Sequence, residues 1–152
     1  MHDEMMSICL EQAWTGQAEG NIPVGSVVAR GGEVLGTGRN RVTTDGSPLK
    51  HAEIVAIEEA CSATGSIDLS GATLYTSLEP CPMCCWAIHV AGIRQLVLGG
   101  RHATAGSRHV GDYSVEKLMA LTRQEMELLT GVRQDECEHL IRSWRQTAEP
   151  GR

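Results

Sequence analysis

The chain has 152 residues and an ordinary globular composition, with 41% hydrophobic and 21% charged residues. Its formal net charge of −6 and its scattered basic residues count against a large polyanionic partner such as nucleic acid. No apolar run approaches the roughly 18 residues that cross a bilayer, and residues 1–4 lack the features of a signal peptide, so we expect a single cytoplasmic domain over residues 1–152 with no membrane partner.

The first third of the chain predicts a helix, a β-hairpin and a loop. Apolar residues recur at helical spacing from Asp3 to about Glu19. Two β-rich runs, 22–30 and 33–38, flank Gly31-Gly32, which favours a tight hairpin turn. Residues 39–50 have the composition of a loop.

Helices and strands alternate through the rest of the chain. We expect helices over residues 51–63, 82–91, 114–121 and 134–145, and strands over residues 72–78, 93–99 and 126–130. Residues 100–113 are expected to form a loop, and the polar tail 146–152 to be loosely held. A hairpin followed by alternating elements implies an α/β fold in which helices cover both faces of a mixed sheet.

Two short motifs contain the residues that suggest a chemical function. His51-Ala52-Glu53 begins one predicted helix, and Pro80-Cys81-Pro82-Met83-Cys84 begins the next. Together they offer one imidazole, two thiolates and a free carboxylate. Three protein ligands leave the fourth tetrahedral position of a zinc ion open to water, as a catalytic site requires. The pattern H-x-E…P-C-x-x-C is the known signature of zinc-dependent deaminases.

The spacing of these residues supports a zinc site more firmly than it supports the role of the carboxylate. Cys81 and Cys84 are three apart, so both sulfurs lie on one helix face, and a helix N-terminus favours thiolates. Zinc held in this way lowers the pKa of water enough to supply hydroxide near neutral pH. Glu53 would point about 200° away from His51 on a regular helix, so spacing alone does not prove that they converge. If both reach inward, Glu53 acts as the general acid and base.

Other interpretations of these residues remain open. His51 and Glu53 are also compatible with an ordinary helix start, where acidic residues are common. The two cysteines would equally suit a structural zinc site whose fourth ligand is Cys85, His89 or Cys61. On that interpretation the protein would be a non-catalytic, zinc-stabilised binding module.

The chain resembles the cytidine deaminase superfamily, in the branch that contains yeast-type cytosine deaminase, guanine deaminase and tRNA adenosine deaminase. The resemblance extends from the first helix through Glu138. It rests on the stretches Ile22-Pro23-Val24-Gly25, Gly38-Arg39-Asn40, His51-Ala52-Glu53, 74–84 and Asp135-Glu136-Cys137. It implies a three-layer α/β/α sandwich around a five-stranded mixed sheet, one Zn²⁺ per subunit and a homodimer.

The same resemblance implies four substrate contacts. Asn40 would offer its side-chain amide to the base, and the Ala52 backbone N–H would bind a ring carbonyl. Leu78 would contribute a backbone carbonyl, and Val24 part of the pocket wall. From the residues alone, Asn40 also suits a simple turn and Val24 a strand core.

The choice of substrate depends on regions with weaker resemblance. Glu79-Pro80-Cys81 resembles the guanine and tRNA branches, since the yeast-type cytosine branch has serine before this proline. The acidic balance, the lack of a basic C-terminal helix and the five aromatic residues count against tRNA. We therefore expect a hydrolase that deaminates a small free nucleobase, either a cytosine-like or isocytosine-like pyrimidine or guanine, with no nucleic-acid partner. The alternative is deamination of adenosine to inosine in tRNA.

Loop 100–113 and the tail after Trp144 correspond to regions that close over the substrate in the relatives, so we expect specificity to lie there. Trp86 suits a pocket wall or the core. His89, His102 and His109 are expected to be surface or loop histidines.

Overall fold

The computed structural model describes residues 1–148, and the end of the predicted tail, residues 149–152, lies outside the described residues. One mixed sheet of five strands runs through the molecule in the order β2-β1-β3-β4-β5. The strands are β1 (Gly25–Arg30), β2 (Glu33–Arg39), β3 (Thr73–Leu78), β4 (Gln95–Gly100) and β5 (Glu127–Leu129). β1 is antiparallel to both β2 and β3, whereas β3, β4 and β5 are parallel.

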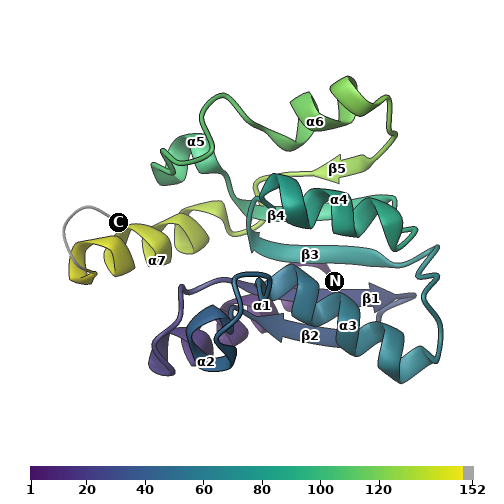
Figure 1. Cartoon of the computed structure of the whole chain (residues 1–152), viewed down its shortest axis with the longest axis horizontal. Coiled ribbons are helices and arrows are strands. Elements are labelled where there is room, and N and C mark those ends of the chain that lie inside the picture. The colour runs from purple at the N-terminus through teal and green to yellow at the C-terminus, as the bar shows by residue number, and fades with distance from the viewer. Residues whose placement is uncertain (149–152) are drawn as a thin grey trace.

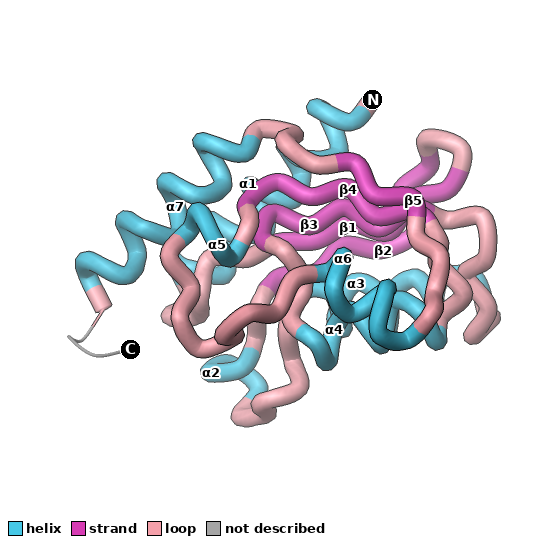
Figure 2. The backbone as a smooth tube through the Cα atoms, turned by 90° about the horizontal axis from the view of Figure 1, so that it is seen from above, coloured by secondary structure: helices cyan, strands magenta, loops and turns pink. Residues whose placement is uncertain are grey.

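Helices cover both faces of this sheet, as two views at right angles show (Figures 1 and 2). The helices are α1 (His2–Ala18), α2 (Val42–Asp45), α3 (Ala52–Thr64), α4 (Pro82–Val90), α5 (His102–Ala105), α6 (Val115–Thr122) and α7 (Gln134–Thr147). α1 and α7 pack on one face, and α3, α4 and α6 lie on the other. The predicted three-layer α/β/α sandwich is therefore confirmed.

Each face of the sheet has its own apolar core. Residues alternate along a strand, so neighbouring side chains enter opposite cores. In β1, Val27 packs with Met6 and Cys9 of α1, whereas Val28 packs with Ala56 of α3. β4 is buried on both faces, as its apolar sequence predicts.

The strand directions bring the polar residues that follow three strands to the same side of the sheet. Because β1 is antiparallel to β2 and β3, and β3 is parallel to β4, strands β2, β3 and β4 end on the same side. Asn40, Glu79 and Arg101 each follow one of these ends directly. In open α/β sheets, ligands bind at the carboxyl ends of strands, and the site described below lies there.

Glycines in β2 let α3 lie directly on the sheet. A Cβ at Gly36 would come within 2.5 Å of the Ala56 carbonyl oxygen, and a Cβ at Gly38 would overlap the Ala52 carbonyl oxygen. This contact fixes the first turn of α3, which carries two of the motif residues.

The differences from the predicted elements are small and lie in the loops. α2 and α5 are single turns inside the predicted loops, and each ends at a glycine in the left-handed conformation, Gly46 or Gly106. Four residues are too short for a helical period to be visible in a sequence. No helix among the described residues is long and apolar enough to cross a membrane.

Candidate metal centre and active-site cavity

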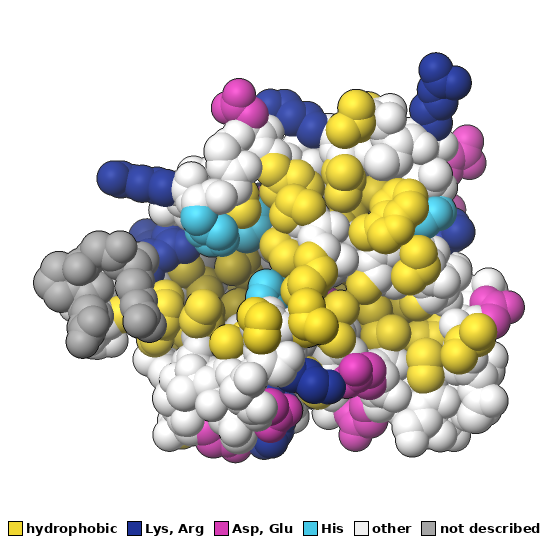
Figure 3. Space-filling view, in the orientation of Figure 1, with side chains coloured by type: hydrophobic (Ala, Val, Ile, Leu, Met, Phe, Trp, Pro, Cys, Tyr) yellow, Lys and Arg dark blue, Asp and Glu magenta, His cyan; other side chains and the backbone are white. Residues whose placement is uncertain are grey.

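A cavity of about 360 Å³ opens at the edge of the sheet where β2, β3 and β4 end. Its walls come from segments around residues 20–24, 40–43 and 51–53, from the end of β3, and from α5 and α7. Figure 3 shows hydrophobic and histidine side chains gathered around this recess. The site is thus built from parts of the chain that are far apart in sequence.

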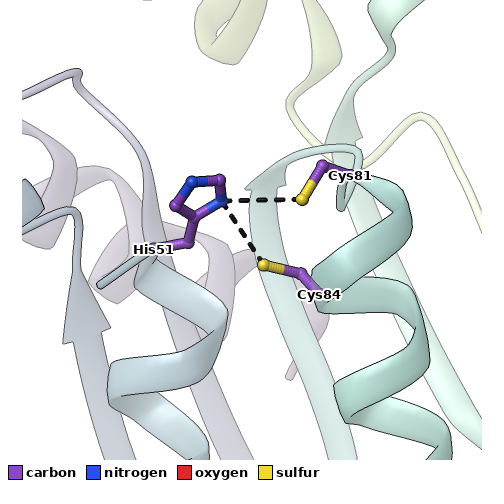
Figure 4. Close-up of side chains that lie close together, drawn as sticks. All are labelled: His51, Cys81 and Cys84. Atoms are coloured by element: carbon purple, nitrogen blue, oxygen red, sulfur yellow. Dashed lines mark hydrogen bonds between the residues drawn. The ribbon is translucent and has the colours of Figure 1, made fainter. Parts of the chain in front are cut away.

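His51, Cys81 and Cys84 converge at the base of this region (Figure 4). His51 Nδ1 lies 3.6 Å from Cys81 Sγ and 3.5 Å from Cys84 Sγ. All three donor atoms lie within 4.8 Å of one another. Among the described residues, no other cluster of histidine, cysteine and carboxylate groups forms a candidate metal site.

The distances fit a zinc ion. Zn–N bonds near 2.0–2.1 Å and Zn–S bonds near 2.3 Å at a tetrahedral angle place nitrogen and sulfur about 3.6 Å apart. Cys61, Cys85 and His89, which the sequence left open as fourth ligands, lie outside the cluster. One imidazole and two thiols therefore suit a three-ligand zinc site, and the assignment of His51, Cys81 and Cys84 as its ligands stays a prediction.

Two helix starts hold these ligands. His51 and Cys81 are the N-cap residues of α3 and α4, each with extended backbone, and Pro82 occupies the first turn of α4. The positive end of a helix dipole favours a thiolate. The neighbouring Cys84 thiol lowers the pKa of Cys81 to about 4, and Cys81 together with burial raises the pKa of Cys84. A coordinated metal cation would deprotonate the second thiol as well.

Glu53 enters the cavity from the same helix start. Its side chain is buried, and Thr76 Oγ1 donates a hydrogen bond of 3.2 Å to its Oε1. His51 precedes the helix in extended conformation, so the 200° separation expected on a regular helix does not apply. Burial raises the pKa of Glu53, which brings this carboxyl closer to the range where a proton carrier works near neutral pH.

The four predicted substrate contacts all line the cavity. Asn40 accepts a hydrogen bond from Val42 N at its Oδ1. Asn40 therefore stabilises a turn, as the sequence also allowed. Its Nδ2 has no acceptor among the described residues. Ala52 begins α3, where a helix has no acceptor for its own first N–H groups. Val24 and Leu78 pack together beside the cavity.

Glu79 links the ends of β3 and β4 to the start of α6 beside the cavity. Its Oε1 accepts hydrogen bonds from Arg101 Nε at 3.0 Å and from His102 N at 3.1 Å. Its Oε2 accepts from Val115 N at 2.9 Å. The carboxylate is buried and ties the segment that carries Cys81 to the starts of α5 and α6.

Glu79→Gln is expected to lower the free energy of unfolding by about 3 kcal/mol, because it leaves buried N–H groups facing another donor. Urea denaturation of the zinc-loaded protein measures this loss. Glu116→Gln is the matched control: Glu116 contacts the same Arg101 from a position whose side chain is 56% exposed. Removing an exposed partner is expected to cost less than about 1 kcal/mol. Equal losses of unfolding free energy in the two variants would contradict a stabilising role for the buried Glu79 carboxylate.

Two expectations about aromatic residues were wrong. His102, expected to be a surface or loop histidine, is 4% exposed and lines the cavity, because it lies two residues after β4 at the sheet edge. Trp86 is 42% exposed on α4, where it stacks on His89 away from the cavity. The position of His102 just after a buried strand was the signal in the sequence that pointed to this site. α7 also contributes Ile141, Trp144 and Arg145 to the cavity.

Comparisons with known proteins agree with this geometry. Residues 1–100 match a family model described as the cytidine and deoxycytidylate deaminase zinc-binding region. The chain is 32% identical over 145 residues to the tRNA-specific adenosine deaminase of Bacillus subtilis, covering 91% of this chain and 86% of the relative. It is 38% identical over 95 residues to guanine deaminase of the same species, covering 62% and 61%.

The chain is also similar to solved structures of the same two kinds of enzyme. A structure from studies of A-to-I editing by tRNA:A34 deaminases matches with a TM-score of 0.79 and 30% identity, over 90% of this chain and 98% of the other. Guanine deaminase from Nitrosomonas europaea matches with a TM-score of 0.80 and 26% identity, over 93% and 83%.

Proposed function

This chain belongs to the cytidine and deoxycytidylate deaminase zinc-binding family, and from that membership we propose that it hydrolyses the C–N bond to the amino group of a nucleobase ring. The observation that carries the proposal is the position of Glu53. Its buried carboxylate lines the same cavity as His51 and Cys81 without belonging to the three-ligand cluster. A purely structural zinc site has four protein ligands and needs no such neighbour.

The residues of the cavity suit this reaction. When bound, zinc supplies Lewis-acid activation of water near neutral pH. Glu53 accepts a proton from the attacking water and donates it to the ring nitrogen. It then accepts the second proton, from the new hydroxyl on the ring carbon as the C=O bond forms, and donates it to the departing amino group. The oxygen of water forms a bond to the ring carbon, the C–N bond breaks, and ammonia leaves. Thr76 holds the carboxylate in place through its hydrogen bond to Oε1.

Polar groups on two sides of the cavity would orient the base. Asn40 Nδ2 and the Ala52 N–H are donors, and the Leu78 carbonyl is an acceptor. Val24 and Ile141 form an apolar wall that excludes water from the ring. A few convergent polar groups in an apolar cavity are typical of small heterocycle sites.

Adenosine in tRNA is the substrate that we propose first. The support is the similarity to tRNA-specific adenosine deaminases, which extends over most of both chains in the Bacillus subtilis relative. Similarity to guanine deaminase is higher in identity but covers a shorter part of the chain. This reverses the order expected from the sequence, where a small free base stood first and tRNA second.

A small free base such as guanine is the second candidate, and the charges beside the cavity favour it. Arg41 forms an ion pair with Asp45, and Lys50 forms one with Glu58. Both cations flank cavity-lining residues in the chain, yet their charge is compensated locally. With a net charge of −6, such pairing leaves little attraction for a phosphate backbone.

One assay separates the two substrates. The zinc-loaded protein is incubated with an anticodon stem-loop RNA that carries adenosine and, separately, with guanine, cytosine and isocytosine. Inosine formation that weakens steeply with salt would support the tRNA proposal. Ammonia release from a free base without any inosine formation would overturn it in favour of the second candidate.

A homodimer, expected from the family, stays a prediction. α4 exposes Trp86 and Val90, at 42% and 67%, on one side of the helix, and a second copy would bury such a surface. The cytoplasmic location also stays a prediction.

A further inference from the structure

His102 is held rigidly at the cavity wall. It is the first residue of α5, and its backbone N–H donates to the buried Glu79 carboxylate at 3.1 Å. Its side chain is 4% exposed and lines the same cavity as His51, Glu53 and Cys81. The imidazole therefore lies beside the proposed reaction site.

Neither ring nitrogen of His102 has a hydrogen-bond partner among residues 1–148. Its ring neighbours are His109 and Tyr113, with centroids 6.2 and 6.1 Å away. Tyr113 directs its hydroxyl to the Pro80 carbonyl instead. Buried polar groups are nearly always hydrogen-bonded, and leaving one without a partner is unfavourable. Each nitrogen of His102 is thus unpaired and exposes less than 1 Å², so a partner in the cavity reaches it when the ring or the residues that cover it shift on binding.

The chemistry of the ring indicates what this partner offers. Burial lowers the pKa of His102, so the imidazole is neutral near pH 7 and presents one donor and one acceptor. A heterocyclic base has both kinds of group along its edge. Arg145, another polar residue of the wall, is engaged elsewhere, because its guanidinium donates to the Ala105 carbonyl and to Ser107 Oγ.

The topology places His102 across the cavity from Asn40. Asn40 follows β2 and His102 is two residues after β4, with β1 and β3 between these strands in the sheet. A substrate held by Asn40 at one side therefore presents its other side to His102. Two fixed polar contacts on opposite walls distinguish bases better than one, since a mismatched base leaves a buried group unpaired.

We propose that His102 is a specificity-determining residue that hydrogen-bonds the substrate heterocycle from the α5 side of the cavity. This role rests on the proposed deaminase function. The hydrogen bond from the His102 backbone N–H to Glu79 holds the start of α5 in place, which reduces the backbone entropy lost on binding.

The test compares three substitutions at His102 in the zinc-loaded protein. His102→Phe keeps a ring but removes both nitrogens, His102→Asn keeps a polar group near the position of Nδ1, and His102→Gln keeps one near Nε2. Steady-state kinetics with the stem-loop RNA and with guanine give KM and kcat separately. Binding of guanine and of the RNA to the same variants in the Glu53→Gln background, by calorimetry, gives affinity without turnover. His139→Phe, at an exposed position on α7, is the control for loss of a histidine.

His102→Phe is expected to weaken binding and lower kcat/KM by about 10- to 100-fold, mainly through KM, with one zinc per subunit retained. One of the two amide variants is expected to recover most of this loss and so identify the contacting nitrogen. His139→Phe is expected to behave as the wild type. An unchanged KM and affinity in all three His102 variants of an active protein would overturn the His102 role alone. Absence of turnover in the wild type would overturn the proposed function and this role with it.

Discussion

Glu53→Gln is expected to lower kcat for deamination by about 10²- to 10⁴-fold, the usual contribution of general acid–base catalysis. The amide has nearly the size of the carboxylate and keeps an oxygen that accepts the hydrogen bond from Thr76, but it cannot carry the proton. Zinc content is expected to stay at one ion per subunit, because Glu53 lies outside the ligand cluster. Ammonia release and metal analysis on the same preparation measure both quantities.

Glu58→Gln provides the matched control on the same helix. Glu58 is 57% exposed in its side chain, pairs with Lys50 and does not line the cavity. Its loss is expected to leave kcat within about twofold and to change stability by less than about 1 kcal/mol. If Glu53→Gln turned over as fast as Glu58→Gln, the carboxylate would not be the proton carrier.

Cys84→Ala is the change with the second large expected effect, since it removes one of three zinc ligands. Losing an outer-shell partner of a metal site already costs about 10- to 100-fold in affinity, and losing a ligand is expected to cost more. After dialysis the variant should contain little zinc, show no turnover and unfold at a lower temperature than the wild type, because bound metal stabilises the folded state.

Cys85→Ala separates ligation from packing. Cys85 is the next residue of α4 and is equally buried, but it points into the apolar core with Ile88 rather than to the metal cluster. This variant is expected to keep one zinc and measurable turnover, with a modest loss of stability. Loss of zinc in Cys85→Ala would instead assign Cys85 as a ligand and support the structural-site interpretation.

The sequence was sufficient to predict the fold because its signals were local and consistent. Apolar periodicity, the Gly31-Gly32 turn and alternating elements place every strand within three residues of its observed bounds. Ser114 caps the start of α6, as serine commonly does, with its hydroxyl accepting a hydrogen bond from Lys117 N at 3.2 Å. The clustering of His51, Cys81 and Cys84 was predictable for the same reason, since each of these residues lies in a short motif.

The rest of the site depends on long-range packing that a sequence does not reveal. Convergence of Glu53 with the cluster required knowing that α3 begins after His51 rather than at it. The burial of His102 follows from Glu79, twenty-three residues earlier in the chain, accepting its backbone N–H. Trp86 lies on an exposed side of α4 although its neighbour Cys85 is in the core. None of these features has a periodic signature.

These long-range contacts position the residues of the proposed active site. The strand ends bring Asn40, Glu79 and His102 to one edge, and the glycines of β2 fix the start of α3 there. The ligand cluster and the carboxylate then occupy a cavity whose walls come from both helical layers. The two motifs therefore predict the type of reaction. The choice of substrate is expected to depend on cavity walls that come from segments far apart in the sequence.

Anomalous diffraction at the zinc edge from crystals of the zinc-loaded protein tests the central claim most directly. A single peak is expected within about 2.0–2.3 Å of His51 Nδ1, Cys81 Sγ and Cys84 Sγ, with the fourth position facing the cavity and the Glu53 carboxylate beyond bonding distance. A zinc ion saturated by four protein ligands, with Glu53 or Cys85 as the fourth, would contradict a catalytic site.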